Sequence, residues 1–245
     1  NSAGAAAVAI GSNGGSGKAL ASITFDGAFY TTSGTQTYTA DSYPINGTNT
    51  AFTASGQNIT FNDAGAGTLL LSNSTNLKID TGSAAIGNIS IGRGITNTAG
   101  DADDAVDVEL IAGTGSISLT TISGYINDVA ISGSHADGIT LKGNIELSNT
   151  DGSDLDIDGK VFISGNVTLD MRNAAQDGAI DFKTTIDGVT ESGSAVADNL
   201  TIYTGESAQG GSLVFNGAIG SLHKLTTLVI NDAADSGTRV DITIP

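Results

Sequence analysis

Hydrophobic and polar residues alternate along nearly the whole chain from residue 19 onward. Short runs of aliphatic and polar side chains each end at Gly, Asn or Asp, as in QNITFND (57–63), NLKIDTG (76–82) and KVFISG (160–165). A period of two predicts β-strands, and the small residues predict tight turns. No run between the strands has the 3.6-residue period of an amphipathic helix, so the sequence predicts an all-β fold and argues against βαβ units.

The strand spacing fits a β-sandwich as well as a β-solenoid, but three features favour the solenoid. Turns use Gly and Asn with only 2 Pro in the chain, and Ile, Val and Leu are interchangeable at apolar positions. Four asparagines also open N-x-[ST] strands, which indicates one repeated position: Asn58, Asn88, Asn166 and Asn199. The predicted fold is a parallel β-helix, with an array of β-sandwiches as the alternative. At roughly 20–25 residues a turn, about ten turns would form a rod of ~50 Å.

Residues 1–18 differ from the rest of the chain because they are small, Gly-rich and poorly patterned. They are interpreted as an N-terminal cap or docking strand, and residues 19–245 as a single β-solenoid domain. Residues 98–107 interrupt the alternation and predict an exposed acidic loop. The chain begins with Asn1 and not with Met, which we interpret as a removed leader or as part of a longer polypeptide.

The charge of the chain argues against nucleic acids and anionic membranes as partners. It has 26 acidic and 9 basic residues, a formal net charge of −17, and no Cys. A nucleic-acid partner requires a basic surface, and an anionic membrane would repel this chain. No run of residues has the length and hydrophobicity of a membrane-spanning helix, so membrane insertion is not expected. Disulfides and thiolate metal sites are excluded, whereas oxygen-liganded cations remain possible partners.

Two groups of aspartates are candidate calcium ligands. The first reads D-x-D-x-D-G at 154–159, which matches the start of a calcium loop, although Gly165 occupies the position where a bidentate Glu would end it. On a strand, these aspartates would project from one face and repel one another, and the alternative is a solvated polar face. The predicted calcium ligands are Asp151, Asp154, Asp156 and Asp158, with a second group at Asp101, Asp103, Asp104 and Asp107.

No motif for catalysis accompanies these carboxylates. His135 and His223 are the only histidines, and neither follows the pattern of a nucleophile elbow. A β-helical polysaccharide lyase would need a basic residue near its calcium ligands, but the three Arg and six Lys are scattered. Only 12 aromatic residues are available as platforms for sugar rings. The sequence therefore predicts a protein that is not an enzyme, with no cofactor other than possible calcium.

Two passages carry a family resemblance. Gly211, Phe215, Gly217, Ile219 and Gly220 follow the pattern G-x-x-x-F-x-G-x-[IV]-G, and residues 225–230 follow L-x-x-L-x-[IV]. Together with TTSGTQTYT at 31–39, these elements resemble the repeats of filamentous-haemagglutinin-like and β-strand-repeat adhesins, which are giant bacterial surface proteins. The resemblance implies a right-handed parallel β-helix, secretion to the cell surface, and a role in adhesion or biofilm formation. It implies no catalytic residues.

The predicted function is that of a noncatalytic, extracellular, structural or adhesive β-solenoid of a bacterial surface protein. Its expected partners are glycans, cell surfaces or neighbouring repeats of a longer chain. The first alternative is a subunit of a self-assembling filament or surface layer, joined end to end to other copies of itself through Ala5–Ile10 and Val240–Pro245. A polysaccharide lyase on the same fold is the second alternative.

Overall fold

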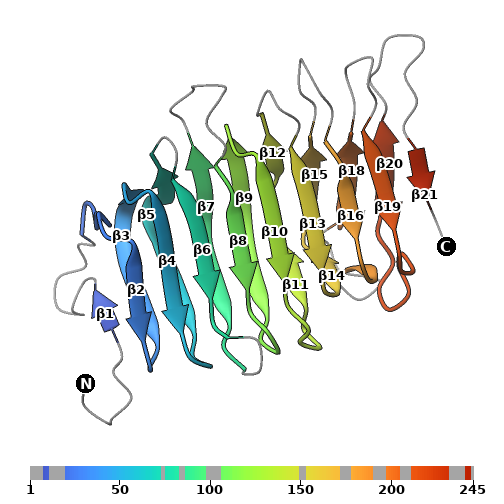
Figure 1. Ribbon diagram of the computed structural model, residues 1–245. Helices are drawn as coiled ribbons and strands as arrows, with labels where there is room; N and C mark the ends of the chain where they lie inside the picture. Colours follow the sequence, from blue (N-terminus) through green and yellow to red (C-terminus); the bar gives the residue numbers. More distant parts are fainter. Residues whose placement is uncertain are drawn as a thin grey trace.

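Parallel β-strands stacked in a solenoid of about seven turns form the computed structural model of this chain (Figure 1). The structure describes residues 8–10, 20–72, 75–82, 86–97, 106–148, 153–171, 178–189, 197–204, 211–231 and 241–243. Within these ranges the regular structure is entirely β, without a helix. The predicted all-β parallel solenoid is therefore confirmed, and the alternative of stacked sandwiches is wrong.

One side of the solenoid, which we call face 1, is a sheet of nine strands that pair in the order of the chain. Every described pair in it is parallel, so each strand lies directly beside its counterpart from the turn before. The strands of face 1 are β2 (Phe29–Thr32), β4 (Asn49–Ala54), β6 (Asn76–Asp80), β8 (Val108–Ile111), β10 (Asp128–Ser132), β13 (Asp154–Asp158), β16 (Ile180–Phe182), β19 (Ser212–Phe215) and β21 (Asp241–Thr243).

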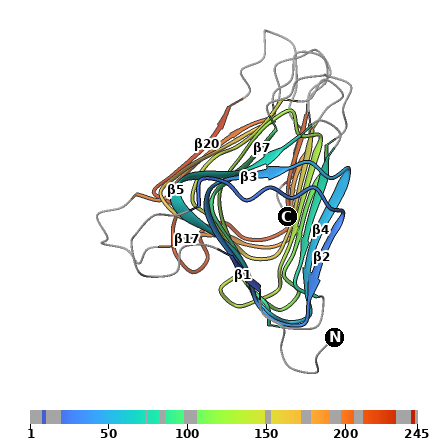
Figure 2. The same cartoon turned by 90° about the vertical axis from the view of Figure 1, so that its left-hand side faces the viewer.

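A second sheet of twelve strands supplies the other two sides. Its early strands run across both sides with a register shift between them: β3 (Gln36–Ile45), β5 (Ile59–Leu71), β7 (Ile89–Asn97) and β9 (Ile117–Gly124). After β9 the two sides have separate strands. Face 2 continues from β1 (Val8–Ile10) and the first halves of the long strands into β11 (Ile139–Leu141), β14 (Val161–Ile163) and β17 (Ile186–Gly188). Face 3 continues from their second halves into β12 (Ile145–Leu147), β15 (Asn166–Asp170), β18 (Asn199–Tyr203) and β20 (Thr227–Asn231). Viewed along its axis, the coil is a triangle (Figure 2).

The predicted number of about ten turns is wrong because the turns are longer than expected. Asp128 and Asp154 occupy equivalent places 26 residues apart, and Asn166 and Asn199 are 33 residues apart. The strands keep their register from turn to turn, so the additional residues lie at the corners of the triangle. Corner length varies freely because a surface connection adds little to the cost of closing a turn.

The interior consists of straight columns of side chains from successive turns, as the interchangeable Ile, Val and Leu predicted. One column on face 3 is buried throughout: Tyr43, Leu69, Ile95, Ile122, Ile145, Leu169 and Ile202. Each fully buried side chain of this kind stabilises the fold by about 1.5–3 kcal/mol. Aromatic residues, in contrast, gather in the first turns, where Phe25, Tyr38, Phe52 and Phe61 pack edge to face or stacked.

Tyr38 makes the stability of this aromatic cluster dependent on alkaline pH. Its hydroxyl donates a hydrogen bond to Oε1 of Gln36 at 3.0 Å inside the solenoid. Burial, with a smaller contribution from Tyr30, raises the pKa of Tyr38 to about 12. The folded state favours the neutral phenol, so its contribution is complete below pH ~10 and is lost as the pH rises towards 12. A difference of about two pKa units corresponds to a loss of up to ~2.7 kcal/mol in the free energy of unfolding.

We therefore expect Tyr38→Phe to flatten the fall in the free energy of unfolding between pH 9 and 12. Urea titrations at several pH values measure this slope, and Tyr125→Phe is the matched control because Tyr125 is 37% exposed. Equal slopes for both variants would contradict the assignment.

Candidate functional site

The most prominent chemical grouping lies on the outer side of face 1. In β13, Leu155 and Ile157 are buried, and the aspartates that alternate with them are exposed, as predicted. Asp128 of β10 pairs with Asp154, and Asp181 of β16 pairs with Asp156, so the neighbouring turns extend the group. We call these five residues the acidic patch: Asp128, Asp154, Asp156, Asp158 and Asp181.

Two carboxylates of the acidic patch bind the backbone of the next turn. Asp128 accepts a hydrogen bond from the N–H of Asp154 at 3.2 Å, and Asp154 accepts one from the N–H of Ala179 at 2.8 Å. Burial raises the pKa of Asp128, and the hydrogen bond from Asp154 opposes this increase. These side chains therefore join successive turns where the strands of face 1 begin.

Lysines neutralise part of this face. Lys183 Nζ lies 2.8 Å from Oδ2 of Asp156, and this hydrogen bond raises the pKa of Lys183. Nearer the N-terminus, Lys78 lies 2.8 Å from Glu109 and 3.7 Å from Asp80. The pairs are solvent-exposed, so each contributes little to stability. Their effect is to alternate the sign of charge along face 1.

The surface around the acidic patch is hollowed where a small residue interrupts a column. Ala130 lies between Glu109 and Asp156 in register. Beside it is an open depression of about 370 Å³, and a second depression extends from Ala130 to Lys183. The first is lined by Asp128, Val129, Ala130, Asp154, Leu155, Asp156, Ala179 and Asp181. This shape suits an extended ligand lying along the face better than an enclosed small molecule.

The calcium hypothesis stays a prediction. In the part of the chain that the structure describes, no three carboxylate or imidazole groups come together as metal ligands would. Alternate residues of a strand are ~6.6 Å apart, whereas calcium ligands lie ~2.3–2.6 Å from their ion. Asp107 instead accepts a hydrogen bond from Asn127 at 3.4 Å. The remaining predicted ligands are outside the described residues: Asp101, Asp103, Asp104 and Asp151. Calorimetric titration of the full chain with calcium tests the hypothesis.

The two histidines lie too far apart to act together. His135 is in the turn between β10 and β11, where its Nδ1 accepts a hydrogen bond from the N–H of Asp137 at 3.0 Å. His223 lies three turns further along, between β19 and β20. There the backbone N–H groups of His223 and Leu222 donate hydrogen bonds to Oδ1 of the buried Asp187, at 3.4 and 2.8 Å. Asp187 thus holds a loop at the C-terminal end, a role that the sequence did not predict.

The asparagines at strand starts form ladders between turns. Asn58 Oδ1 accepts a hydrogen bond from the N–H of Asn88 at 2.9 Å, and Asn88 Oδ1 accepts one from the N–H of Ser116 at 2.8 Å. At another corner, Nδ2 of Asn199 donates to Oδ1 of Asn166 at 2.6 Å. The prediction of one repeated position is wrong in this detail, because the first pair precedes face 2 and the second opens face 3.

We expect Asn88→Ala to lower the free energy of unfolding by about 1–3 kcal/mol, because it removes the acceptor for the N–H of Ser116. Asn88→Asp is the matched control, since it keeps an oxygen at the accepting position. Urea denaturation compares the two variants with the parent chain. If the alanine and aspartate variants were equally stable, the ladder would have no measurable part in stability.

Comparison with known proteins identified no relative of this chain. No protein-family model, curated protein or solved structure matches the chain. Among the described residues there is no helix with the length and apolar character that crossing a membrane requires.

Proposed function

We propose that this chain is a noncatalytic structural and adhesive β-solenoid of a bacterial surface protein, acting outside the cell. The observation that supports this most directly is the straight column of outward side chains along face 1. Lys78, Glu109, Ala130, Asp156 and Asp181 follow one another in register on consecutive turns. Such columns place groups at intervals of ~4.8 Å over a long surface. The resemblance of the sequence to bacterial adhesin repeats supports the same role.

Adhesion through face 1 would depend on many weak contacts in a row. A polymer lying along the axis meets one outward side chain of this column at each turn, so several weak contacts reinforce one another through effective concentration. The acidic patch repels polyanions and attracts positive charge. Its chemistry therefore favours neutral glycans, or glycans with free amino groups, over acidic polysaccharides.

Binding of the full chain to immobilised neutral, amino-bearing and acidic glycans tests this function. The double variant Asp156→Asn/Asp158→Asn is expected to weaken binding to amino-bearing glycans. The control Asp137→Asn/Glu146→Gln changes the net charge equally at exposed positions away from the patch and is expected to bind like the parent chain. Equal binding by both variants, or an absence of glycan binding, would refute adhesion through face 1. Release of unsaturated or reducing sugars would favour the lyase instead.

A further inference from the structure

The first turn of the solenoid leaves two inward-facing side chains, those of Ile10 and Leu20, partly uncovered. Ile10 pairs in register with Tyr38, but it is 41% exposed whereas Tyr38 is 2% exposed. Leu20 pairs with Ala40 and is 42% exposed, whereas Ala40 is fully buried. In inner turns, such positions are covered by a turn on each side. Here the described residues cover them from one side only.

The last turn has the same property at the opposite end. Leu228 and Ile230 of β20 pair with Leu200 and Ile202 of β18, which are fully buried. Leu228, however, is 37% exposed, and Ile230 is only partly buried. Along β20, the backbone groups that point away from β18 have no partner strand among the described residues. An unpaired parallel edge with exposed apolar residues is a template for another strand.

The last strand of the coil and its first strand lie on consecutive faces of the triangle. The final strand, β21, lies on face 1, and the first strand, β1, lies on face 2. After β1, residues 20–25 run along face 3 beside 40–45, and β2 then begins face 1. A second copy placed beyond β21 would therefore continue the coil with the next face in order. The two ends lie at opposite extremes of the molecule, so they can meet only between molecules (Figure 1).

We propose that the C-terminal end of one molecule binds the N-terminal end of a second copy of this chain. Residues 20–25 of the second copy add to face 3 as a parallel strand beside β20. Phe25 pairs with Ile45, which places Ile23 opposite Tyr43 at the head of the face 3 column. The same column ends at Ile230. In the joined molecules Ile23 covers Ile230, and the aliphatic column passes from one copy to the next.

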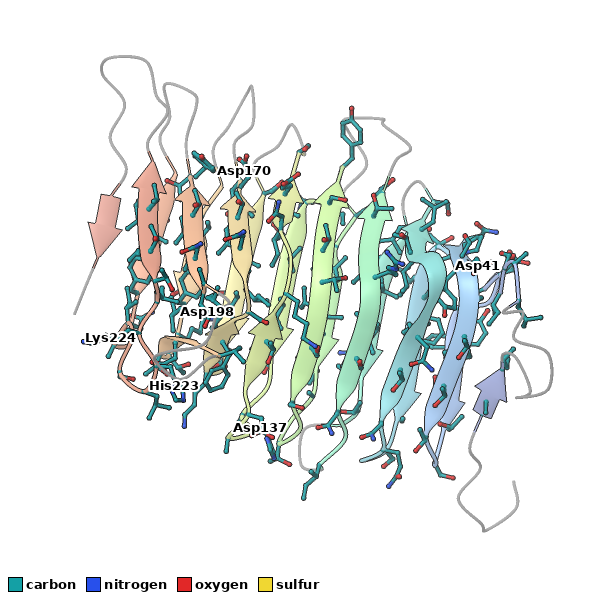
Figure 3. The ribbon with its side chains drawn as sticks, turned by 180° about the vertical axis from the view of Figure 1, so that it is seen from behind. Asp41, Asp137, Asp170, Asp198, His223 and Lys224 are labelled. Carbon is teal, nitrogen blue, oxygen red and sulfur yellow. The ribbon has the colours of Figure 1, made fainter. Side chains whose placement is uncertain are left out.

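Exposed side chains of opposite charge lie near the two ends. Asp41 is exposed in the first turns, and Lys224, next to His223, is exposed in the last turn (Figure 3). Asp41 lies within β3 where it turns from face 2 to face 3, and Lys224 precedes β20 at the same corner. In the joined molecules residues 20–25 lie between β20 and β3, so Lys224 and Asp41 are about two turns, ~10 Å, apart. Their attraction adds a small, salt-sensitive preference for the head-to-tail orientation. Because the head-to-tail contact does not close on itself, it generates a filament.

Engineered cysteines test the proposed register, because the chain has no Cys of its own. Ser22 and Val229 are the outward neighbours of Ile23 and Ile230, so Ser22→Cys/Val229→Cys places two thiols on adjacent strands of different copies, within the Cα distance of a disulfide. Mild oxidation is expected to produce a ladder of linked oligomers. In the control Ser22→Cys/Thr201→Cys, the second thiol is one turn further inside, and the chain is expected to stay mainly monomeric. Equal amounts of linked oligomers in the two variants, or none in either, would overturn the proposed register.

A second variant tests the contact without a cross-link. Leu228→Asp adds a charge to the exposed apolar end, and Thr227→Asp is the control on the outward side of the same strand. Light scattering is expected to show large assemblies for the parent chain and the control, and a mass near 24.3 kDa for Leu228→Asp, with unchanged circular dichroism. A parent chain that is monomeric at every concentration would overturn the inference. This inference rests on the structural role proposed above. Glycan binding by that monomer would leave the adhesive role intact, so the two failures are distinguishable.

Discussion

Replacing Gly124 by alanine is expected to lower the free energy of unfolding by about 2–5 kcal/mol. Gly124 has a φ of +99°, which costs an L-residue ~1–2 kcal/mol. A Cβ at this position would also meet the carbonyl oxygen of Asn97 on the preceding turn, and overpacking of this kind costs ~1–3 kcal/mol. The strand pair β7–β9 has to separate to admit the methyl group.

Gly165→Ala separates the effect of the positive φ from the effect of the crowded Cβ. Gly165 has a similar φ of +85°, but no atom lies within 4 Å of the Cβ that alanine would add. Its replacement should therefore cost only the conformational part, ~1–2 kcal/mol. Urea denaturation of both variants measures the difference. Similar losses in the two variants would show that close stacking of turns at Gly124 is not a constraint.

Phe182→Ala is expected to lower the free energy of unfolding by about 3–5 kcal/mol, because it removes a large buried side chain and leaves a cavity. Phe182 and Phe215 are both buried on neighbouring turns of face 1, and their rings stack at a centroid distance of 5.4 Å and an angle of 4°. The cavity left by alanine would be bordered on one side by the Phe215 ring, which loses its stacking partner.

Phe162→Ala is the matched control for this prediction. Phe162 is the middle residue of β14 and points outward between the buried Val161 and Ile163. The same change of side chain should lower the free energy of unfolding by less than ~1 kcal/mol there. Thermal and urea unfolding compare the pair. Losses of equal size would contradict the assignment of inward and outward positions.

The inward and outward positions could be predicted from the sequence because alternation is a local property. The period of two in DLDID predicted that Leu155 and Ile157 would be buried and the aspartates exposed, and both predictions are confirmed. The number of turns could not be predicted in this way. It depends on how many residues each corner contains, and a corner has no periodic pattern.

The same distinction explains what was missed in the candidate site. Asp128 and Asp154 are neighbours only because one turn at that point contains 26 residues. Without the turn length, the sequence does not indicate that Asp128, Asp181 or Lys183 lies beside β13. The asparagines illustrate this too, since their shared N-x-[ST] pattern did not reveal that they occupy two different corners. Once one register pair is known, the other partners on the same two strands follow by counting.

The short separation in sequence between paired strands has a consequence for how the chain folds. Residues that pair on neighbouring turns are 20 to 33 positions apart from one end of the solenoid to the other. In a chain of 245 residues this is about a tenth of the length, a relative contact order more usual for helical bundles than for β-proteins. Each new turn therefore closes a loop of similar entropy, however many turns already exist. Folding can start at any well-packed turn and extend in both directions. A longer solenoid would fold in more steps, each with a similar loop-closure entropy.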